Sequence, residues 1–277
     1  MRVALAQFDS SIGDVEANLA RMGTLTAEAN SHGSDLTVFP ELATHGYALG
    51  EIPDDRSLGA RDHRLAQLSS AGCDVLAGFH EDGGVRTYNS AAYLSRGTLV
   101  HVHRKLYLPN YLAWEERKHG SPGQTLRAFD TPHARIATLI CNDAWQPVLP
   151  WLAAQDGAEV LLVPTNSTAG LGPGLLDTMD YWHLLLVFIA RMQQCWVVFV
   201  NRVGTEGGAR FWGGSRVIDP TGEIVDQAAF WEPALITVDI DVAAARRRRR
   251  EVPLLAEARL ALIEREVRRL IQEGGDM

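Results

Sequence analysis

The chain has 277 residues, of which 46% are hydrophobic, enough for a sizeable core in one large domain or two small ones. Acidic residues outnumber basic ones by 34 to 26, and the net charge of -8 argues against nucleic acid as a partner. The first residues turn acidic too early for a signal peptide. The most apolar segment, residues 184–200, contains Arg191, Gln193 and Gln194, so no membrane span is predicted.

The first half of the chain alternates β-type runs with helical stretches. In chain order the predicted elements are a strand at 2–8, a helix at 14–31, a strand at 35–40, a helix at 62–72, a strand at 74–79, and a hairpin of 89–95 and 98–105. Gly33 closes the first helix, Pro40 ends the second strand, and Arg96-Gly97 forms the hairpin turn.

The second half continues the alternation. The predicted elements are a strand at 134–140, a helix at 147–156, a strand at 158–164, a helix at 177–194, a strand at 195–201, a hairpin at 215–225, and a last strand at 234–240. The glycine-rich stretch 204–214 is predicted to be a flexible loop. This order indicates an α/β fold with layered helices and sheets and inserted hairpins.

We predict one domain over residues 1–241 and an arm over 242–277 that belongs to the same domain. The arm begins with the arginine run 246–250, which we interpret as solvated or as facing acidic groups on a partner subunit. Apolar residues then recur at helical spacing, which predicts an amphipathic helix that covers a surface of this chain or of another copy. They are Leu255, Leu262, Ile263, Val267, Leu270 and Ile271.

Three polar side chains follow three different β-type runs. Cys141 follows the run "ARIATLI", Glu41 follows "DLTVFP", and Lys105 ends "TLVHVHRK". Ligands of open α/β sheets gather at strand ends, so these side chains could meet. Because a free thiol has a pKa of about 8.5, a nucleophilic cysteine needs a base, and a carboxylate beside an ammonium could supply it.

The cysteines themselves give no framework for a disulfide or a zinc site. Cys73, Cys141 and Cys195 are far apart and odd in number, which predicts a reducing, cytoplasmic compartment. Cys73 and Cys195 are interpreted as core residues. His101 and His103 share one face of a strand and could begin a metal site, but no third ligand is evident, so a structural role is favoured.

The stretches around Glu41, Lys105 and Cys141 resemble the nitrilase, or carbon–nitrogen hydrolase, superfamily over nearly the whole chain. The pattern is "FPE" with a downstream "GY", then "RKLYLP", then "IC" followed by "D" and "W". The resemblance implies a four-layer α-β-β-α sandwich and a homodimer or larger assembly. It implies Glu41 as general base, Lys105 as oxyanion stabiliser together with the backbone N–H of Asn142, and Cys141 as nucleophile. It implies no metal or organic cofactor.

The segment "LPNYLAWEERKHGSPG" resembles the glutaminase part of glutamine-dependent NAD synthetases. It carries a further glutamate, Glu116, which the resemblance places beside the lysine and the substrate. No "SGGxDS"-type nucleotide loop is present, so the ATP-using half of those enzymes is expected to be missing. Residues expected to line the substrate pocket are Tyr111, Asn142, Trp145, Asn166 and Ser167.

The sequence therefore predicts hydrolysis of a small carboxamide with release of ammonia, through a Cys141 thioester. Three alternatives remain open. The chain could be a stand-alone glutaminase that supplies ammonia to a separate synthetase, or it could hydrolyse an N-carbamoyl amide. It could also be a catalytically silent binding protein that has kept the fold.

Overall fold

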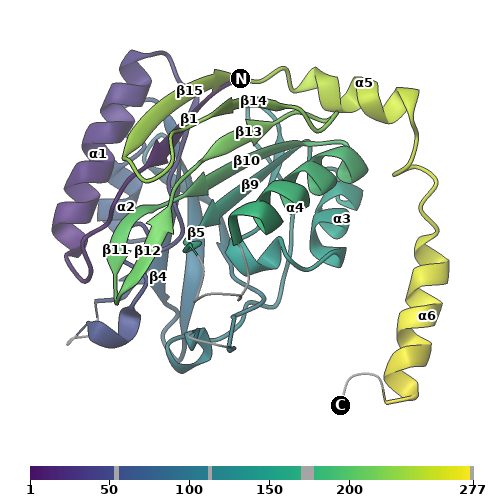
Figure 1. The fold of residues 1–277 in the computed structure, drawn as a ribbon, viewed down its shortest axis with the longest axis horizontal. Coiled ribbons are helices and arrows are strands. Elements are labelled where there is room, and N and C mark those ends of the chain that lie inside the picture. Colours follow the sequence, from purple (N-terminus) through teal and green to yellow (C-terminus); the bar gives the residue numbers. More distant parts are fainter. Residues whose placement is uncertain (53–55, 112–113, 170–177, 275–277) are drawn as a thin grey trace.

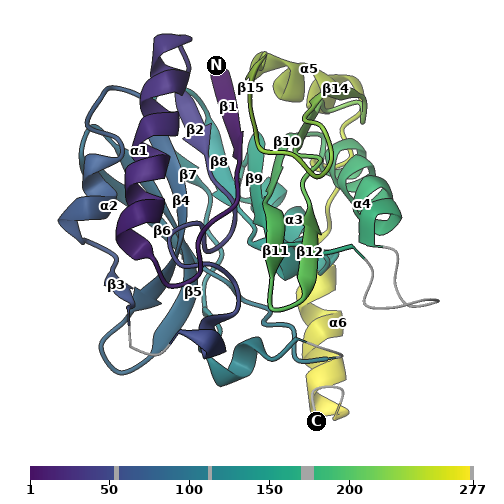
Figure 2. The same ribbon diagram turned by 60° about the vertical axis from the view of Figure 1, so that its left-hand side comes forward.

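The computed structural model describes residues 1–52, 56–111, 114–169 and 178–274. Two β-sheets pack face to face, and helices cover the outer face of each (Figures 1 and 2). The predicted four-layer α-β-β-α sandwich is therefore confirmed. None of the helices in these ranges is both long and apolar enough to cross a membrane.

The first sheet has seven strands and is formed by the N-terminal half of the chain together with the last strand. In spatial order it contains β15 (Ala234–Asp239), β1 (Arg2–Gln7), β2 (Leu36–Val38), β4 (Asp74–Asp82), β5 (Thr87–Ser95) and β6 (Thr98–Arg104), with β3 (Leu58–Gly59) beside β4. Strands β1, β2 and β4 run parallel, while β5 and β6 form the predicted hairpin. The parallel arrangement brings the ends of β2 and β4 to the same edge.

The second sheet has six strands. In spatial order these are β14 (Ile224–Gln227), β13 (Arg216–Ile218), β10 (Trp196–Asn201), β9 (Val160–Thr165), β8 (Arg135–Thr138) and β7 (Phe129–Asp130). Strands β8, β9 and β10 are parallel and are buried on both faces, as expected for apolar runs without alternation.

Each layer has its own apolar contacts. The helices α1 (Val15–Ser31) and α2 (His63–Gln67) cover the first sheet, and α3 (Val148–Gln155) and α4 (Thr178–Gln193) cover the second. Between the sheets lies a separate cluster that includes Leu5, Val38 and Val198. Two predicted helices differ slightly: α2 is shorter than the predicted 62–72, and residue 177 lies outside the described residues.

One predicted loop is a strand pair. The glycine-rich stretch 204–214 forms most of a two-stranded hairpin, β11 (Val203–Glu206) and β12 (Ala209–Trp212). Its two-residue turn consists of Gly207 and Gly208, both with positive φ, which suits a tight hairpin turn. The prediction of a flexible loop here is wrong, because the glycines serve the turn and leave the flanking residues free to pair.

The arm consists of two further helices, α5 (Ala243–Glu251) and α6 (Leu260–Gln272). The arginine run differs in part from its prediction. In α5, Arg246 forms an ion pair with Glu159, and Arg249 donates to the backbone carbonyls of Ala158 and Gln193. These two arginines are one turn apart on one helix face, so both reach their own chain. Helix α6 stands away from the layers (Figure 1).

Candidate active site

Cys141 lies at a sharp turn just after β8. It begins the short 3-10 turn Cys141–Asp143 and has φ of 45°, in the left-handed region that residues with a Cβ rarely adopt. Its side chain contacts both the cluster between the sheets and the cluster under α3 and α4. Backbone strain of this kind persists only where the surroundings enforce it, and it is concentrated at functional sites.

Asp143 fixes this turn against the end of β6. One carboxylate oxygen accepts hydrogen bonds from the backbone N–H groups of Leu106 and Tyr107, both at 2.9 Å. The other accepts from His103 Nε2 at 2.9 Å and from the Ile140 N–H at 3.1 Å. The aspartate is fully buried, so it sets the position of the chain around Lys105 relative to Cys141.

Glu41 follows β2 and is buried. Its Oε1 accepts from Asn89 Nδ2 and Lys105 Nζ, both at 2.7 Å, and its Oε2 accepts from the Asn166 backbone N–H at 2.8 Å. A close approach of β4 makes this position possible. A Cβ on Gly78 would lie 2.3 Å from the Pro40 carbonyl oxygen, so only glycine lets β4 approach the backbone beside Glu41 this closely.

Lys105 joins two carboxylates. Its ammonium donates to Glu41 and, at 2.6 Å, to Glu116 Oε1, which also accepts from the Tyr47 hydroxyl at 2.5 Å. Lys105 itself is 1% exposed, so this ion pair is shielded from solvent. The structure therefore brings four predicted catalytic residues together, from three strand ends and the loop after β6.

Burial and the neighbouring charges shift the pKa values of Cys141, Lys105 and Glu116. Burial raises the pKa of the Cys141 thiol well above its usual range, Glu41 and Glu116 raise it further, and Lys105 opposes them. Burial would lower the pKa of Lys105, but the two glutamates outweigh that effect and raise it. Burial also raises the pKa of Glu116 to about 7 against the opposing charge of Lys105. A thiol with so raised a pKa favours its protonated form at neutral pH, so the predicted nucleophilic role of Cys141 calls for a base.

The residues predicted to line the substrate pocket occupy different settings. Tyr111 is half exposed and its hydroxyl lies 3.5 Å from Asn142 Oδ1, while Asn142 Nδ2 donates to the Tyr107 carbonyl. Asn166 is buried and neither polar atom of its side chain has a partner in the described part of the chain. A buried amide without partners is a group available to a ligand.

Trp145 and Ser167 are engaged elsewhere. The Trp145 ring stacks on Tyr181 and meets Trp182 edge to face, both on α4. The Ser167 hydroxyl accepts a hydrogen bond from Trp212 Nε1 at 3.2 Å. These contacts give both residues a role in packing, and their assignment to substrate binding stays a prediction.

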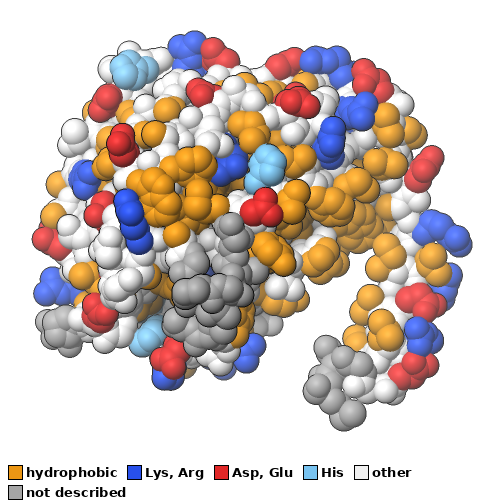
Figure 3. Space-filling view, in the orientation of Figure 1, with side chains coloured by type: hydrophobic (Ala, Val, Ile, Leu, Met, Phe, Trp, Pro, Cys, Tyr) orange, Lys and Arg blue, Asp and Glu red, His pale blue; other side chains and the backbone are white. Residues whose placement is uncertain are grey.

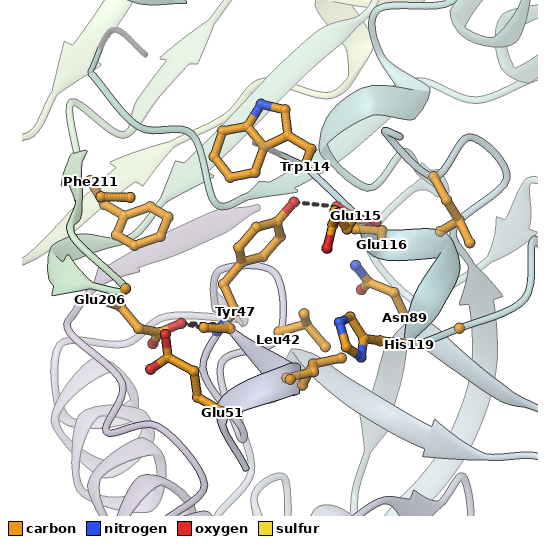
Figure 4. Close-up of a pocket in the computed structure, with 17 residues that line it drawn as sticks. Leu42, Tyr47, Glu51, Asn89, Trp114, Glu115, Glu116, His119, Glu206 and Phe211 are labelled. Atoms are coloured by element: carbon orange, nitrogen blue, oxygen red, sulfur yellow. Dashed lines mark hydrogen bonds between the residues drawn. The ribbon is translucent and has the colours of Figure 1, made fainter. Parts of the chain in front are cut away.

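A cavity of about 320 Å³ lies beside Glu116 (Figure 4). Glu116, Asn89, Leu42 and Tyr47 form part of its wall, whereas Glu41, Lys105 and Cys141 are not among its described lining residues. The cavity is therefore next to the charged network and shares Glu116 and Asn89 with it. Its other described lining residues include Glu51, Trp114, Glu115, His119, Glu206 and Phe211.

Sequence reasoning missed four residues of this site. Asn89 donates a hydrogen bond to Glu41, and Tyr47 donates one to Glu116. His103 and Asp143 form a hydrogen bond that connects β6 with the turn after β8. Tyr47 and Asp143 belong to the "GY" and "IC…D" patterns, so their signal was present without an assigned role. His101, the other strand histidine, stacks on Phe129. Among the residues the structure describes, no group of three or more His, Cys, Asp and Glu could hold a metal ion.

Comparison with known proteins shows similarity to one family of enzymes. The model of the family described as carbon-nitrogen hydrolase matches residues 2–250. The glutamine-dependent NAD(+) synthetase of Thermotoga maritima is 34% identical over 87% of this chain, which corresponds to 42% of that protein. The chain thus spans less than half of that longer relative.

Two further relatives match along nearly their whole length. The omega-amidase NIT2 of Bos taurus is 29% identical over 97% of this chain and 98% of its own. An amidase variant from Nesterenkonia sp. AN1 is 26% identical, with a TM-score of 0.81 and 96% of each chain covered. That structure shows covalent addition of the acetamide moiety of fluoroacetamide at the active-site cysteine of the amidase.

Proposed function

This chain belongs to the carbon–nitrogen hydrolase family, and from that premise we propose that it releases ammonia from a small carboxamide through a thioester on Cys141. The observation that carries this proposal is the buried network in which Lys105 pairs with Glu41 and Glu116 while all three charges act on Cys141. An amide carbonyl is a poor electrophile, so its attack needs a strong nucleophile and a positive charge already in place.

The first half of the reaction forms the thioester. Glu41 accepts the proton of the Cys141 thiol, and Sγ attacks the amide carbon. Lys105 and the Asn142 backbone N–H stabilise the resulting oxyanion. The tetrahedral intermediate then collapses: the C–N bond breaks, and Glu41 returns its proton to the departing ammonia.

The second half restores the enzyme. Glu41 removes a proton from water, and the hydroxide oxygen attacks the thioester carbon. The C–S bond then breaks, the carboxylic acid leaves, and the thiolate regains the proton from Glu41. Every step uses side chains already in the site, and the proton that Glu41 takes in each half is returned in the same half.

The experiment is a screen for ammonia release from small amides, N-carbamoyl amino acids and glutamine. Turnover of a simple amide supports the proposal. A strong preference for glutamine favours the stand-alone glutaminase, a candidate that the 34% identity to an NAD(+) synthetase supports. No turnover of any of them, with no acyl adduct, would favour a silent binding protein.

The mechanism is tested on the substrate found. Glu41→Gln keeps shape but cannot accept a proton, so it should abolish the acyl adduct that mass spectrometry detects on Cys141. Lys105→Ala should lower turnover by about a hundredfold or more with the fold intact. Cys73→Ala and Cys195→Ala are matched controls, because both thiols are buried in the core. Near-normal turnover in Glu41→Gln would refute its role as base.

A further inference from the structure

The cavity beside Glu116 presents hydrogen-bond acceptors that have no donor. Asn89 is 5% exposed, and while its Nδ2 donates to Glu41, its Oδ1 has no partner among the described residues. Glu116 in its ionised form is similar: Oε1 accepts from Lys105 and Tyr47, and the buried Oε2 has no partner there. Because buried acceptors without donors are costly, a ligand group that fits this wall should bring N–H donors.

The charges that line the cavity also favour a ligand with N–H donors. Glu115 pairs with Lys118, and Glu206 pairs with the buried Arg202. The carboxylate of Glu51, by contrast, has no ion-pair partner in the part of the chain that the structure describes. No lysine or arginine occurs among the cavity's described lining residues. The wall therefore favours a positively charged group.

Aromatic rings complete the lining. The Tyr47 ring meets Trp114 and Phe211 edge to face, with centroids 5.4 Å and 6.3 Å apart. Figure 4 shows Glu51 and Glu206 near the backbone of Tyr47, and Glu115, Glu116 and Asn89 on the side of its hydroxyl. The Arg202 guanidinium already lies over the Phe211 ring, 4.4 Å from its centroid. Tyr47 and Trp114 are therefore the rings of this group that can contact methylene groups and attract an ammonium by cation–π interaction.

We propose that this cavity binds an alkylammonium group, so that the enzyme prefers small amides that also carry a protonated amine. The substrate preference rests on the proposed amide hydrolysis, whereas binding of the cation does not. The cavity touches Glu116 and Asn89 but none of Glu41, Lys105 and Cys141, so the ammonium would be held next to the reacting groups and apart from them.

The first test measures binding without turnover. Isothermal titration calorimetry compares pentylammonium, 1-pentanol and pentanoate on the wild-type protein. We expect pentylammonium to bind at least about tenfold more tightly than the alcohol, and pentanoate to bind most weakly. Equal binding of the alcohol, or tighter binding of pentanoate, would overturn the proposal.

Matched variants locate the site. Glu51→Gln should reduce the advantage of pentylammonium over 1-pentanol at least about threefold, because it removes the unpaired carboxylate. Glu28→Gln removes an exposed carboxylate on α1 and should leave that advantage unchanged. Equal losses in both variants would mean that only the net charge matters, and the cavity assignment would be wrong.

The second test uses turnover and finds which end of the substrate enters. On the acyl side, 5-aminopentanamide is compared with hexanamide. On the leaving side, N-(4-aminobutyl)acetamide is compared with N-pentylacetamide, and release of acetate is measured, because these secondary amides release an alkylamine in place of ammonia. A higher kcat/KM for the amine in either pair supports the proposal and places the cavity on that side. Turnover without preference in both pairs would refute the proposed specificity and leave amide hydrolysis standing. Tight pentylammonium binding without any turnover would refute the proposed reaction and leave the cation site standing.

Discussion

Glu116 shares its only described cationic partner, Lys105, with a second carboxylate. Two carboxylates, Glu41 and Glu116, share one ammonium, and Glu116 also lies against an apolar and aromatic wall. Burial is the largest cause of its raised pKa, which is about 7 against an ordinary value of 4.5. Between these two values the folded protein therefore keeps a proton that the unfolded chain has released.

This proton makes stability depend on pH. Since the folded state binds more protons between pH 4.5 and 7, the contribution of Glu116 to the free energy of unfolding falls as pH rises through this range. One pKa unit corresponds to about 1.4 kcal/mol, so the loss is at most about 3–4 kcal/mol. We predict that Glu116→Gln, which cannot ionise, becomes more stable relative to wild type as pH rises from 4.5 to 7.5.

The measurement is urea denaturation of both proteins at several pH values. A constant offset between the two curves reflects the lost hydrogen bonds and does not bear on the prediction. Only a widening difference in favour of the variant does. Glu115→Gln is the control, because this exposed carboxylate on the neighbouring residue pairs only with Lys118 in the described structure. Parallel curves for Glu116→Gln and wild type would contradict the raised pKa.

At this scale, sequence motifs predicted which residues meet but not how each is held. Glu41, Lys105, Glu116 and Cys141 were all found by pattern. Asn89 was not, because an asparagine early in a predicted strand gives no local sign that it faces a carboxylate 48 residues earlier. Contacts of this kind depend on the pairing of strands that are distant in sequence, and hydrophobic periodicity does not encode them.

At the scale of elements, the site depends on how closely β4 approaches the loop after β2. A Cβ on Gly78 would lie 2.3 Å from the Pro40 oxygen and 2.6 Å from the Leu42 nitrogen. Both are backbone atoms, so rotation of a side chain cannot relieve the clash. The position of Glu41 is therefore set by a glycine on a different strand.

We predict that Gly78→Ala lowers kcat by about a hundredfold, because displacement of a catalytic group by about 1 Å has effects of this size. It should also destabilise the fold by about 1–3 kcal/mol through overpacking. Ammonia release per folded molecule and thermal unfolding measure the two effects separately. Gly59→Ala in β3 is the control, since its Cβ would meet no atom within 4 Å. A normal kcat in Gly78→Ala would show that the loop tolerates the shift.

Most elements were predictable from the sequence, and the exceptions have physical reasons. Strands buried on both faces, such as β9 and β10, show as continuous apolar runs. The hairpin of β11 and β12 was misjudged because five glycines in eleven residues look flexible. Yet Gly207 and Gly208 form a two-residue turn in which both have positive φ, and the pair Glu206–Ala209 closes it. Turn geometry, not glycine content, was the informative signal.

At the scale of the whole molecule, the described residues leave two apolar surfaces uncovered. One lies on the outer helices α3 and α4 (Figure 3) and includes Val148, Leu152, Tyr181, Leu184, Phe188 and Met192. The other is one side of α6, formed by Leu260, Ile263, Val267, Leu270 and Ile271, none of them buried. Exposed patches of this kind mark interaction surfaces, and two patches on one chain fit a symmetric dimer.

The boundary of the arm decides which truncation can test whether α6 takes part in a dimer interface. Ala245 of α5 is fully buried in the cluster between the sheets, and Arg246 pairs with Glu159. Removing everything after Asp241 would therefore damage the fold as well as any interface. A chain that ends at Glu257 keeps α5 and loses α6 with the residues that flank it, and no residue of α6 is buried.

We predict that the chain ending at Glu257 assembles more weakly than the full chain and keeps its fold. A helix of 13 residues is marginal in water, so α6 needs a surface to remain helical, and a second copy offers one in α3 and α4. Sedimentation velocity over a range of concentrations measures assembly, and circular dichroism checks the fold. Val267→Glu in the apolar stripe should weaken assembly similarly, while Arg268→Gln on the polar side should not. An unchanged oligomer in the truncated chain would show that α6 is not part of the interface.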